Sequence, residues 1–226
     1  MGRERAAYVQ DLFTRIARRY DLINRLMTGG QDLRWRERVV HLANLGPAAR
    51  LLDIGAGTGD LTRAARRQYP QAQVVAADFT LEMMRIGRKS GDLPFIAADA
   101  LCLPFAGAAF DAVVSGFLMR NVVDLRLALR EQYRLLKAGG RIVVLDTTRP
   151  GRTLFTPLIW LHLHVVIPVL GRLLSGSRKA YQYLPESTEH FVTAEQLAGL
   201  LSAAGFTDVR FERFMFGTIA IHSAKK

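Results

Sequence analysis

The segment from Leu51 to Asp60 constrains the fold of this chain more than any other. It reads LLDIGAGTGD, so two leucines lead into Asp53 and then into glycines at alternate positions, Gly55, Gly57 and Gly59. Glycine is needed where a backbone turns sharply and lies against a ligand, because a Cβ atom would obstruct the approach. The segment therefore predicts a strand, a tight binding loop and the start of a helix.

The charges around this loop indicate the kind of ligand. A dinucleotide-binding loop places a pyrophosphate at the helix N-terminus. Here Asp53 precedes the turn and Asp60 follows it, and two carboxylates would repel a pyrophosphate. They suit a ligand with a cationic end, such as S-adenosylmethionine (SAM), with its ammonium and sulfonium. Asp78 and Phe79 follow the apolar run 74–77, where an acidic side chain holds ribose hydroxyls in folds of this kind. We therefore predict a SAM site.

Strand-like and helix-like segments alternate after Arg50. Strands are predicted at 51–54, 73–77, 94–98, 111–116 and 141–146, and helices at 60–69, 80–89 and 124–136, the last ending at Gly139-Gly140. Further along the chain we predict a helix capped by Thr193. An antiparallel hairpin is predicted after it, with strands near 207–214 and 217–223. Such alternation is typical of a parallel sheet wrapped by helices. The predicted fold class is α/β, a Rossmann-like, mostly parallel seven-stranded sheet with helices on both faces.

We expect a single domain over residues 1–226. Residues 1–49 contain amphipathic helices that the sheet does not need, so we interpret them as a helical cap over the pocket. Residues 50–150 form the predicted SAM-binding core, and residues 191–226 the last helix and hairpin. Residues 151–190 hold the most apolar run, interrupted by prolines, histidines and an arginine. Because a membrane span needs about 20 nearly unbroken apolar residues, we interpret this run as an inserted helical lid, with a core helix as the open alternative.

Charge and cysteine content restrict the partners. The net charge of +11 attracts polyanions, so an anionic membrane and nucleic acid are both considered, beside a basic surface with no specific partner. Cys102 is the one cysteine, which excludes an internal disulfide and suggests a reducing compartment. No metal-ligand spacing and no signal peptide is evident. We expect a cytoplasmic protein without a metal; peripheral contact with the cell membrane and a homodimer are left open.

The carboxyl ends of the predicted strands nominate the site, because ligand groups project there in an open parallel sheet. These ends supply Asp53 and Thr58, Asp78, Asp99 with Ala100, Ser115, and Asp146. Beyond Ser115, the sequence GFLMRNV places Arg120 and Asn121 beside the transferable group of the cofactor, where both can stabilise an oxyanion. An ion pair between Arg120 and Asp124 at a helix start is the structural alternative.

Four stretches carry a resemblance to a known family: FTRIARRYDLINRLMTGGQDLRWR, LLDIGAGTGDLT, RNVVD with LREQYRLLKAGGRIVVLD, and AYQYLPES at 180–187. Over nearly the whole chain, the sequence resembles the UbiE/MenG family of quinone C-methyltransferases. The resemblance implies contacts to SAM from Thr58, Asp78, Asp99 with Ala100, and Ser115. It implies methylation of a polyprenyl quinol, demethylmenaquinol giving menaquinol, with Arg120 and Asn121 stabilising the phenolate and Tyr20 orienting the ring.

The chain departs from the family pattern where substrate is chosen. Leu118 stands where the family has a glycine, and Leu145-Asp146-Thr147-Thr148 stands where the family has L-E-F-S. Methylation of another small aromatic or lipid-like molecule therefore stays open. No nucleic-acid substrate is expected, because strand four ends in SGFL rather than Asn-Pro-Pro-aromatic and Cys102 lacks a partner cysteine. The presence of Thr58, Asp78 and Arg120 argues against a non-catalytic SAM-binding protein.

Overall fold

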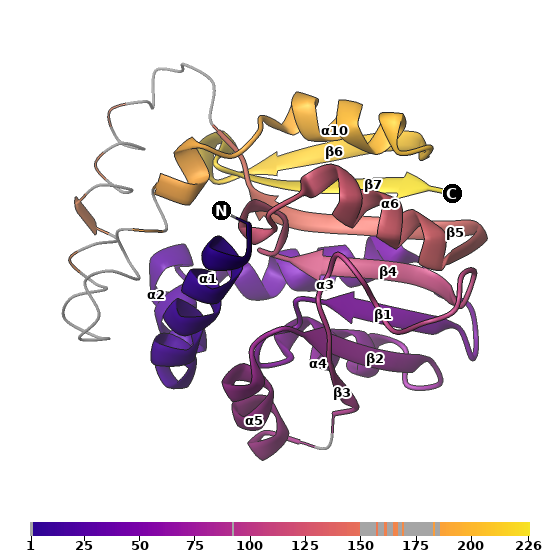
Figure 1. Ribbon diagram of the computed structural model, residues 1–226, viewed down its shortest axis with the longest axis horizontal. Coiled ribbons are helices and arrows are strands. Elements are labelled where there is room, and N and C mark those ends of the chain that lie inside the picture. The colour runs from indigo at the N-terminus through magenta and orange to yellow at the C-terminus, as the bar shows by residue number, and fades with distance from the viewer. Residues whose placement is uncertain are drawn as a thin grey trace.

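A seven-stranded sheet forms the centre of the molecule in the computed structural model, which describes residues 2–91, 93–149, 157, 161, 165–166, 169, 183 and 186–226. Its order is β3-β2-β1-β4-β5-β7-β6 (Figure 1). Strand β7 runs antiparallel to β5 and β6, and the remaining neighbours pair in parallel. The predicted mostly parallel sheet is confirmed. The strands are β1 (Arg50–Ile54), β2 (Gln73–Asp78), β3 (Phe95–Ala97), β4 (Phe110–Gly116), β5 (Leu136–Thr147), β6 (Thr207–Phe214) and β7 (Ile219–Lys225).

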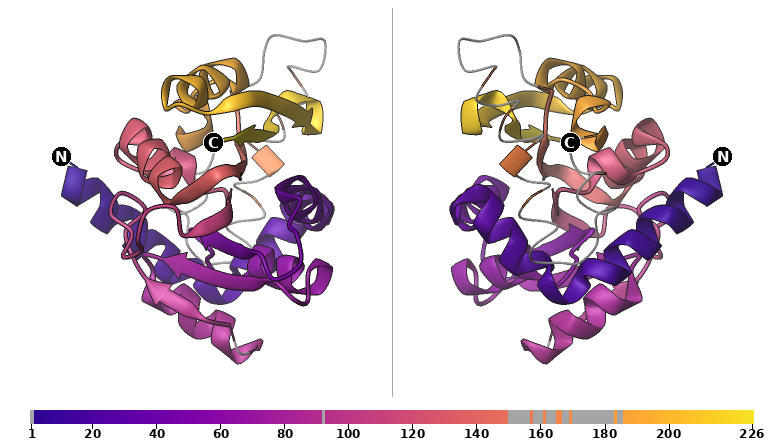
Figure 2. Two further views of the ribbon diagram at one scale, coloured as in Figure 1. Left: turned by 90° about the vertical axis from the view of Figure 1, so that its right-hand side faces the viewer. Right: turned by 90° about the vertical axis from the view of Figure 1, so that its left-hand side faces the viewer.

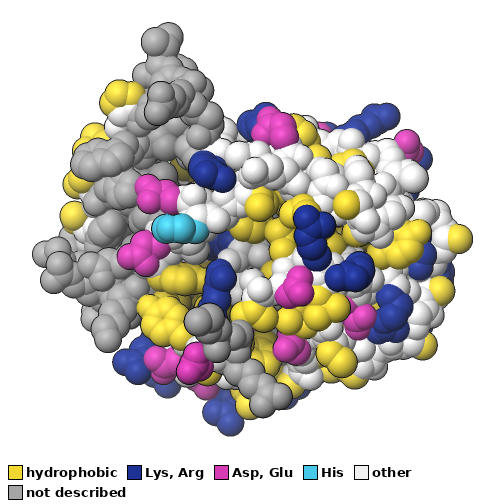
Figure 3. All heavy atoms as spheres, turned by 45° about the horizontal axis from the view of Figure 1, so that its top comes forward, with side chains coloured by type: hydrophobic (Ala, Val, Ile, Leu, Met, Phe, Trp, Pro, Cys, Tyr) yellow, Lys and Arg dark blue, Asp and Glu magenta, His cyan; other side chains and the backbone are white. Residues whose placement is uncertain are grey.

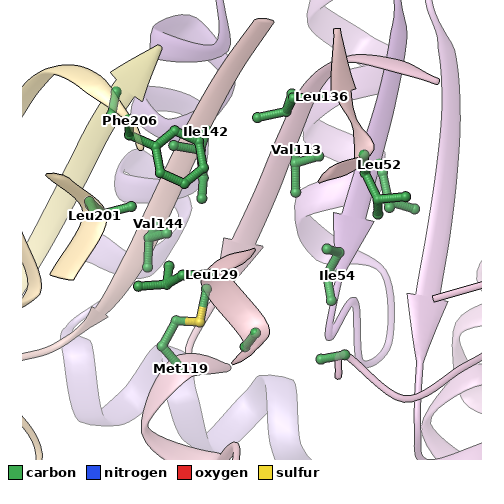
Figure 4. Packing of buried hydrophobic residues seen from close by; sticks show 14 of the residues in the cluster. Leu52, Ile54, Val113, Met119, Leu129, Leu136, Ile142, Val144, Leu201 and Phe206 are labelled. Atoms are coloured by element: carbon green, nitrogen blue, oxygen red, sulfur yellow. The ribbon is translucent and has the colours of Figure 1, made fainter. Parts of the chain in front are cut away.

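Helices cover both faces of this sheet (Figures 1 and 2). In β5, Ile142 and Val144 pack with residues of α6 and α10, whereas Val143 and Leu145 pack with residues of α3 and α4. This division follows from the strand period, because successive side chains point to opposite faces. Figure 4 shows the first of these two cores. The helices are α1 (Gly2–Ile16), η1 (Ala17–Arg19), α2 (Tyr20–Thr28), α3 (Gln31–Ala43), α4 (Asp60–Gln68), α5 (Leu81–Lys89), η2 (Met119–Asn121), α6 (Leu125–Leu135), α10 (Ala194–Ala203) and η4 (Met215–Gly217).

The N-terminal helices divide between two tasks. Helices α1 and α2 enclose a small apolar core of their own, built from Leu12, Ile16, Ile23 and Met27. Helix α3 instead lies on the sheet, and its side chains Trp35, Val39 and Val40 are buried against it. The expectation that residues 1–49 serve only as a cap is therefore wrong for α3, since its apolar stripe completes one face of the sheet core.

Strand β5 begins earlier than the glycine pair at residues 139–140 suggests. Helix α6 ends at Leu135 and β5 starts at Leu136, so the helix end expected at Gly139-Gly140 is wrong. Leu136 pairs with Phe110, and the register then shifts before Arg141 pairs with Ala112, which is the signature of a bulge. A Cβ atom on Gly140 would lie 2.9 Å from the Lys137 carbonyl oxygen. Glycine here serves the bulge and not a helix end.

The C-terminal region agrees with its prediction. Strands β6 and β7 pair as an antiparallel hairpin, and Thr193 opens α10 with a capping box completed by Gln196. Most of the lid predicted at 151–190 lies outside the described residues, including His162 and His164. Among the residues that are described, no helix combines the length and the apolar character needed to cross a bilayer.

Gly87 offers a test of how closely α5 must approach the binding loop. A Cβ atom there would lie 2.5 Å from the Thr58 carbonyl oxygen and 2.6 Å from the Phe95 ring. Alanine favours a helix by about 1 kcal/mol over glycine, but overpacking of this kind costs about 1–3 kcal/mol. We expect Gly87→Ala to lower the free energy of unfolding in urea. Gly199→Ala in α10, where a Cβ atom meets nothing within 4 Å, should raise it; a gain from both substitutions would contradict the close packing.

Candidate active site

The glycine loop between β1 and α4 is joined by hydrogen bonds to the end of β2. The backbone N–H groups of Gly55 and Ala56 donate to the Ala77 carbonyl at 2.8 and 3.1 Å. The N–H of Gly57 donates to the Asp78 carboxylate at 2.7 Å. All three glycines predicted for the loop have positive φ, which few other residues adopt without strain. The loop is thereby shaped before any ligand arrives.

Two buried carboxylates lie beneath this loop. Asp53 is fully buried; its Oδ2 accepts from the Thr62 hydroxyl at 2.6 Å, and its Oδ1 has no hydrogen-bond partner. Burial raises the pKa of the Asp53 carboxyl to about 7, and the neighbouring Asp78 adds to this. Burial also raises the pKa of Asp78, against the opposing hydrogen bonds from the backbone of Thr80 and Gly57. A cation placed here would stabilise the charged form of both groups.

The cap roofs the loop and is tied to it by polar contacts. Thr58 donates its hydroxyl to Asp21 of α2 at 2.8 Å, and Arg25 reaches Asp60 at 3.1 Å. Gln10 of α1 donates to the Phe79 carbonyl at 3.0 Å. The pocket beneath has an apolar roof from the cap, made of Ala6, Val9, Phe13 and the ring of Tyr20. The site is therefore polar on the loop side and apolar on the cap side.

A second polar centre surrounds Phe117, at the end of β4. The Phe117 backbone has a φ of 61°, a strained value for an aromatic residue. Two guanidinium groups approach its ring, Arg36 at 5.8 Å and Arg120 at 5.3 Å from the centroid. Each is paired with a buried carboxylate at 2.5 Å, Arg36 with Asp32 and Arg120 with Asp146. The proposed ion pair between Arg120 and Asp124 is therefore wrong, and Asp124 caps α6 instead.

Ten of the predicted site residues line one pocket, namely Tyr20, Asp53, Gly55, Gly57, Thr58, Asp78, Phe79, Asp99, Ala100 and Asn121. Three do not. Gly59 lies behind the loop, where a Cβ atom would meet Leu93. Ser115 is fully buried with an unpaired hydroxyl. Arg120 is held away by Asp146, although its charge lowers the pKa of Tyr20 against the larger effect of burial, which raises it.

The cap supplies residues that the sequence pattern did not single out. Asp21 contacts Thr58, and burial followed by the nearby Asp60 raises its pKa. Arg36 lines the pocket from α3. The spacing of Asp32 and Arg36, one helical turn apart, was a usable signal for their pairing. No local sequence pattern identifies Asp21 as a site residue, because its partner Thr58 lies 37 residues away in the chain.

Comparison with known proteins assigns the class of this chain. A solved SAM-dependent methyltransferase from Thermotoga maritima, described as a possible histamine N-methyltransferase, has the same fold, with a TM-score of 0.68 at 20% identity over 96% of this chain and 98% of that chain. This likeness shows the fold; together with the family match and the relatives given next, it defines a SAM-dependent methyltransferase.

Two curated relatives are more similar in sequence. The "Ubiquinone/menaquinone biosynthesis C-methyltransferase UbiE" of Desulfotalea psychrophila is 45% identical, covering 95% of this chain and 88% of its own. The "Demethylmenaquinone methyltransferase" of Thermus thermophilus is 46% identical, covering 93% of this chain and 98% of its own. The family model described as the ubiE/COQ5 methyltransferase family matches residues 1–226, so the chain belongs to that family.

The raised pKa of Asp53 predicts a pH-dependent stability. Between the ordinary value of 3.8 and about 7, the folded protein keeps a proton on Asp53 that the unfolded chain has lost. The free energy of unfolding therefore falls as the pH rises through this window. Asp53→Asn removes this titration, so its stability relative to the wild type should increase from pH 4 to pH 7 and then level off.

Urea unfolding of both proteins from pH 4 to pH 8 measures the difference. Asp208→Asn is the control, because Asp208 is exposed and Lys225 lowers its pKa. The difference in the free energy of unfolding between Asp208→Asn and the wild type should be constant from pH 5 to pH 8. A constant difference for Asp53→Asn as well would show that Asp53 keeps an ordinary pKa.

Proposed function

We propose that this protein transfers the methyl group of SAM to a ring carbon of a polyprenyl quinol, converting demethylmenaquinol to menaquinol. The observation that carries the proposal is the two-sided pocket, in which buried carboxylates face an apolar roof. The names of the two relatives, both C-methyltransferases of quinone biosynthesis or of demethylmenaquinone, support the same acceptor.

The loop residues suit SAM. Asp53 presents an unpaired, buried carboxylate oxygen, and such a group is costly without a cationic or hydrogen-bonding partner. Asp78 lies at the end of β2 for the ribose hydroxyls, with the exposed Phe79 ring beside it. Asp99 and Ala100 line the pocket beyond for the adenine. We also assign Asp21 to this side, because it supplies a further carboxylate next to Thr58.

SAM supplies an electrophilic methyl group to the reaction. The acceptor must first lose a proton from a ring hydroxyl, so that electron density reaches the ring carbon that attacks. The protein contributes position and electrostatics. Asn121 lines the pocket, and its side-chain amide donates one N–H hydrogen bond to the Phe117 carbonyl. The second N–H of the same amide can then donate to the phenolate. Tyr20 in the roof orients the ring, and Arg120 raises the positive potential around Tyr20.

Two observations bear on rival substrates. Leu118 lines the pocket and packs so tightly on the loop that a Cβ atom on Gly55 would lie 2.8 Å from its Cδ1. This filling favours a smaller aromatic acceptor as the second candidate. Nucleic acid gains no support from the face in Figure 3, where basic side chains alternate with acidic and apolar ones and form no continuous track. A lipid-tailed acceptor implies peripheral contact with an anionic membrane, which we include in the proposal.

The decisive experiment is transfer of labelled methyl from SAM to demethylmenaquinol, beside ubiquinol-type, tail-less and small aromatic acceptors. Label in the naphthoquinol ring supports the proposal. Label only in a small aromatic acceptor would select the second candidate, and SAM binding without any transfer would support a binding protein. Asn121→Ala should lower kcat by about 10²-fold or more through loss of one oxyanion donor, with SAM affinity unchanged by calorimetry.

Arg120 requires a test that separates its charge from its packing. Arg120→Ala leaves Asp146 buried and unpaired, which costs about 3–5 kcal/mol of stability. The double variant Arg120→Ala with Asp146→Asn removes the stranded charge, so its stability should largely recover. We expect methyl transfer to stay low in the double variant, because the positive potential near Tyr20 is still missing. Recovery of both stability and activity would show that Arg120 only maintains the fold.

A further inference from the structure

Among the described residues, the exposed large apolar side chains lie at the carboxyl end of the sheet, in the cap, at the start of α3 and in the run after β5. Phe79 and Leu81 follow the carboxyl end of β2, and Val123 and Leu127 follow that of β4. Phe216 lies in the turn before β7, whose first residue pairs with the last residue of β5. The other exposed large apolar residues among those described lie in the cap, at the start of α3 or in the apolar run after β5, namely Tyr8, Leu22, Leu26, Leu33, Leu161, Val165, Val166 and Val169.

The opposite end of the sheet differs. Its described turns, at residues 44–49, 69–72, 104–109 and 203–206, contain none of the exposed large apolar side chains. Single exposed leucines and valines scattered over a surface need no explanation. The absence of exposed large apolar side chains from these turns at the opposite end of the sheet does need one. This end also carries the pocket, which opens beneath the cap. The asymmetry therefore points to a partner that is apolar and lies next to the site.

Helix α2 presents the clearest part of this end. Ile23 and Met27 are buried on its inner side, whereas Leu22 and Leu26, one turn apart, are 55% and 48% exposed. Arg18 precedes them by one further turn, and Arg34 follows at the start of α3. Both arginines are exposed, and neither has a carboxylate partner in the described part of the chain. Apolar side chains beside unpaired guanidinium groups match the two requirements of binding to an anionic bilayer surface.

We propose that the carboxyl end of the sheet docks on an anionic lipid bilayer, with Leu22 and Leu26 entering the interface and Arg18 and Arg34 contacting the lipid phosphates. A bilayer is favoured over a second copy of this chain, because a self-interface would place Arg18 and Arg34 near each other's positive charge. This proposal specifies which surface makes the membrane contact proposed above, and it rests on that part of the proposed function. It opens the pocket directly towards the layer that holds a lipid-tailed acceptor.

The test is co-sedimentation of the full chain with vesicles of phosphatidylglycerol and phosphatidylcholine, without SAM or acceptor. We expect Leu22→Glu with Leu26→Glu to weaken binding more than tenfold. Arg18→Gln with Arg34→Gln should weaken it about thirtyfold on the anionic vesicles, with little change on phosphatidylcholine alone. Matched controls away from this surface are Ala138→Glu with Ala203→Glu, and Lys89→Gln with Arg210→Gln, all at exposed positions; these should bind as the wild type does.

Three outcomes would overturn the proposal. They are absence of vesicle binding by the wild type, equal loss in the control variants, and unchanged binding by the leucine variant. Sedimentation equilibrium that shows a wild-type dimer broken by the leucine variant, without vesicle binding, would assign the surface to a second copy. Methyl transfer to a tail-less acceptor without vesicles is measured separately. It should be unchanged in the leucine variant, so failure of the acceptor assignment and failure of the docking surface are distinguishable.

Discussion

The hydrogen bonds between the glycine loop and the end of β2 position everything else at the site. The Ala77 carbonyl and the Asp78 carboxylate together receive three backbone N–H groups of the loop. These contacts hold the loop over the sheet edge, where α4 begins, and the cap then docks on the loop through Thr58 and Asp60. A change at this junction would therefore be transmitted to the roof of the pocket as well as to its floor.

The buried charges around Phe117 are stabilised pairwise. Arg36 and Arg120 each have one carboxylate partner, and the ring of Phe117 lies near both guanidinium groups. Removal of any single partner leaves an uncompensated charge in the interior, which is far more costly than the pair itself is stabilising. The region around Phe117 is thus held in one arrangement, which explains how its strained backbone persists. Such rigidity suits an enzyme whose contribution is mainly the placement of two reactants.

Local sequence patterns predicted the loop and the sheet, because glycine spacing and strand-helix alternation are written within short segments. The carboxylates at the strand ends were found for the same reason. Contacts between segments far apart in the sequence could not be predicted in this way. The pairing of Arg120 with Asp146 spans 26 residues, and the sequence offered only a local pair with Asp124 as the structural alternative. The periodicity of α3 showed an apolar stripe but not which surface would cover it, so α3 was assigned to the cap although it packs on the sheet. The roles assigned to individual site residues stay predictions.

The cap is also attached through main-chain oxygens. Arg5 donates to the Arg120 carbonyl at 3.3 Å, and Gln10 donates to the Phe79 carbonyl at 3.0 Å. A main-chain oxygen is present whatever side chain its residue carries, so these two attachments place no demand on the identity of residues 79 and 120. Evolution can therefore replace side chains around the pocket, and so change the accepted ring, while α1 stays docked. The ring that the pocket accepts and these two attachments of α1 can therefore change independently.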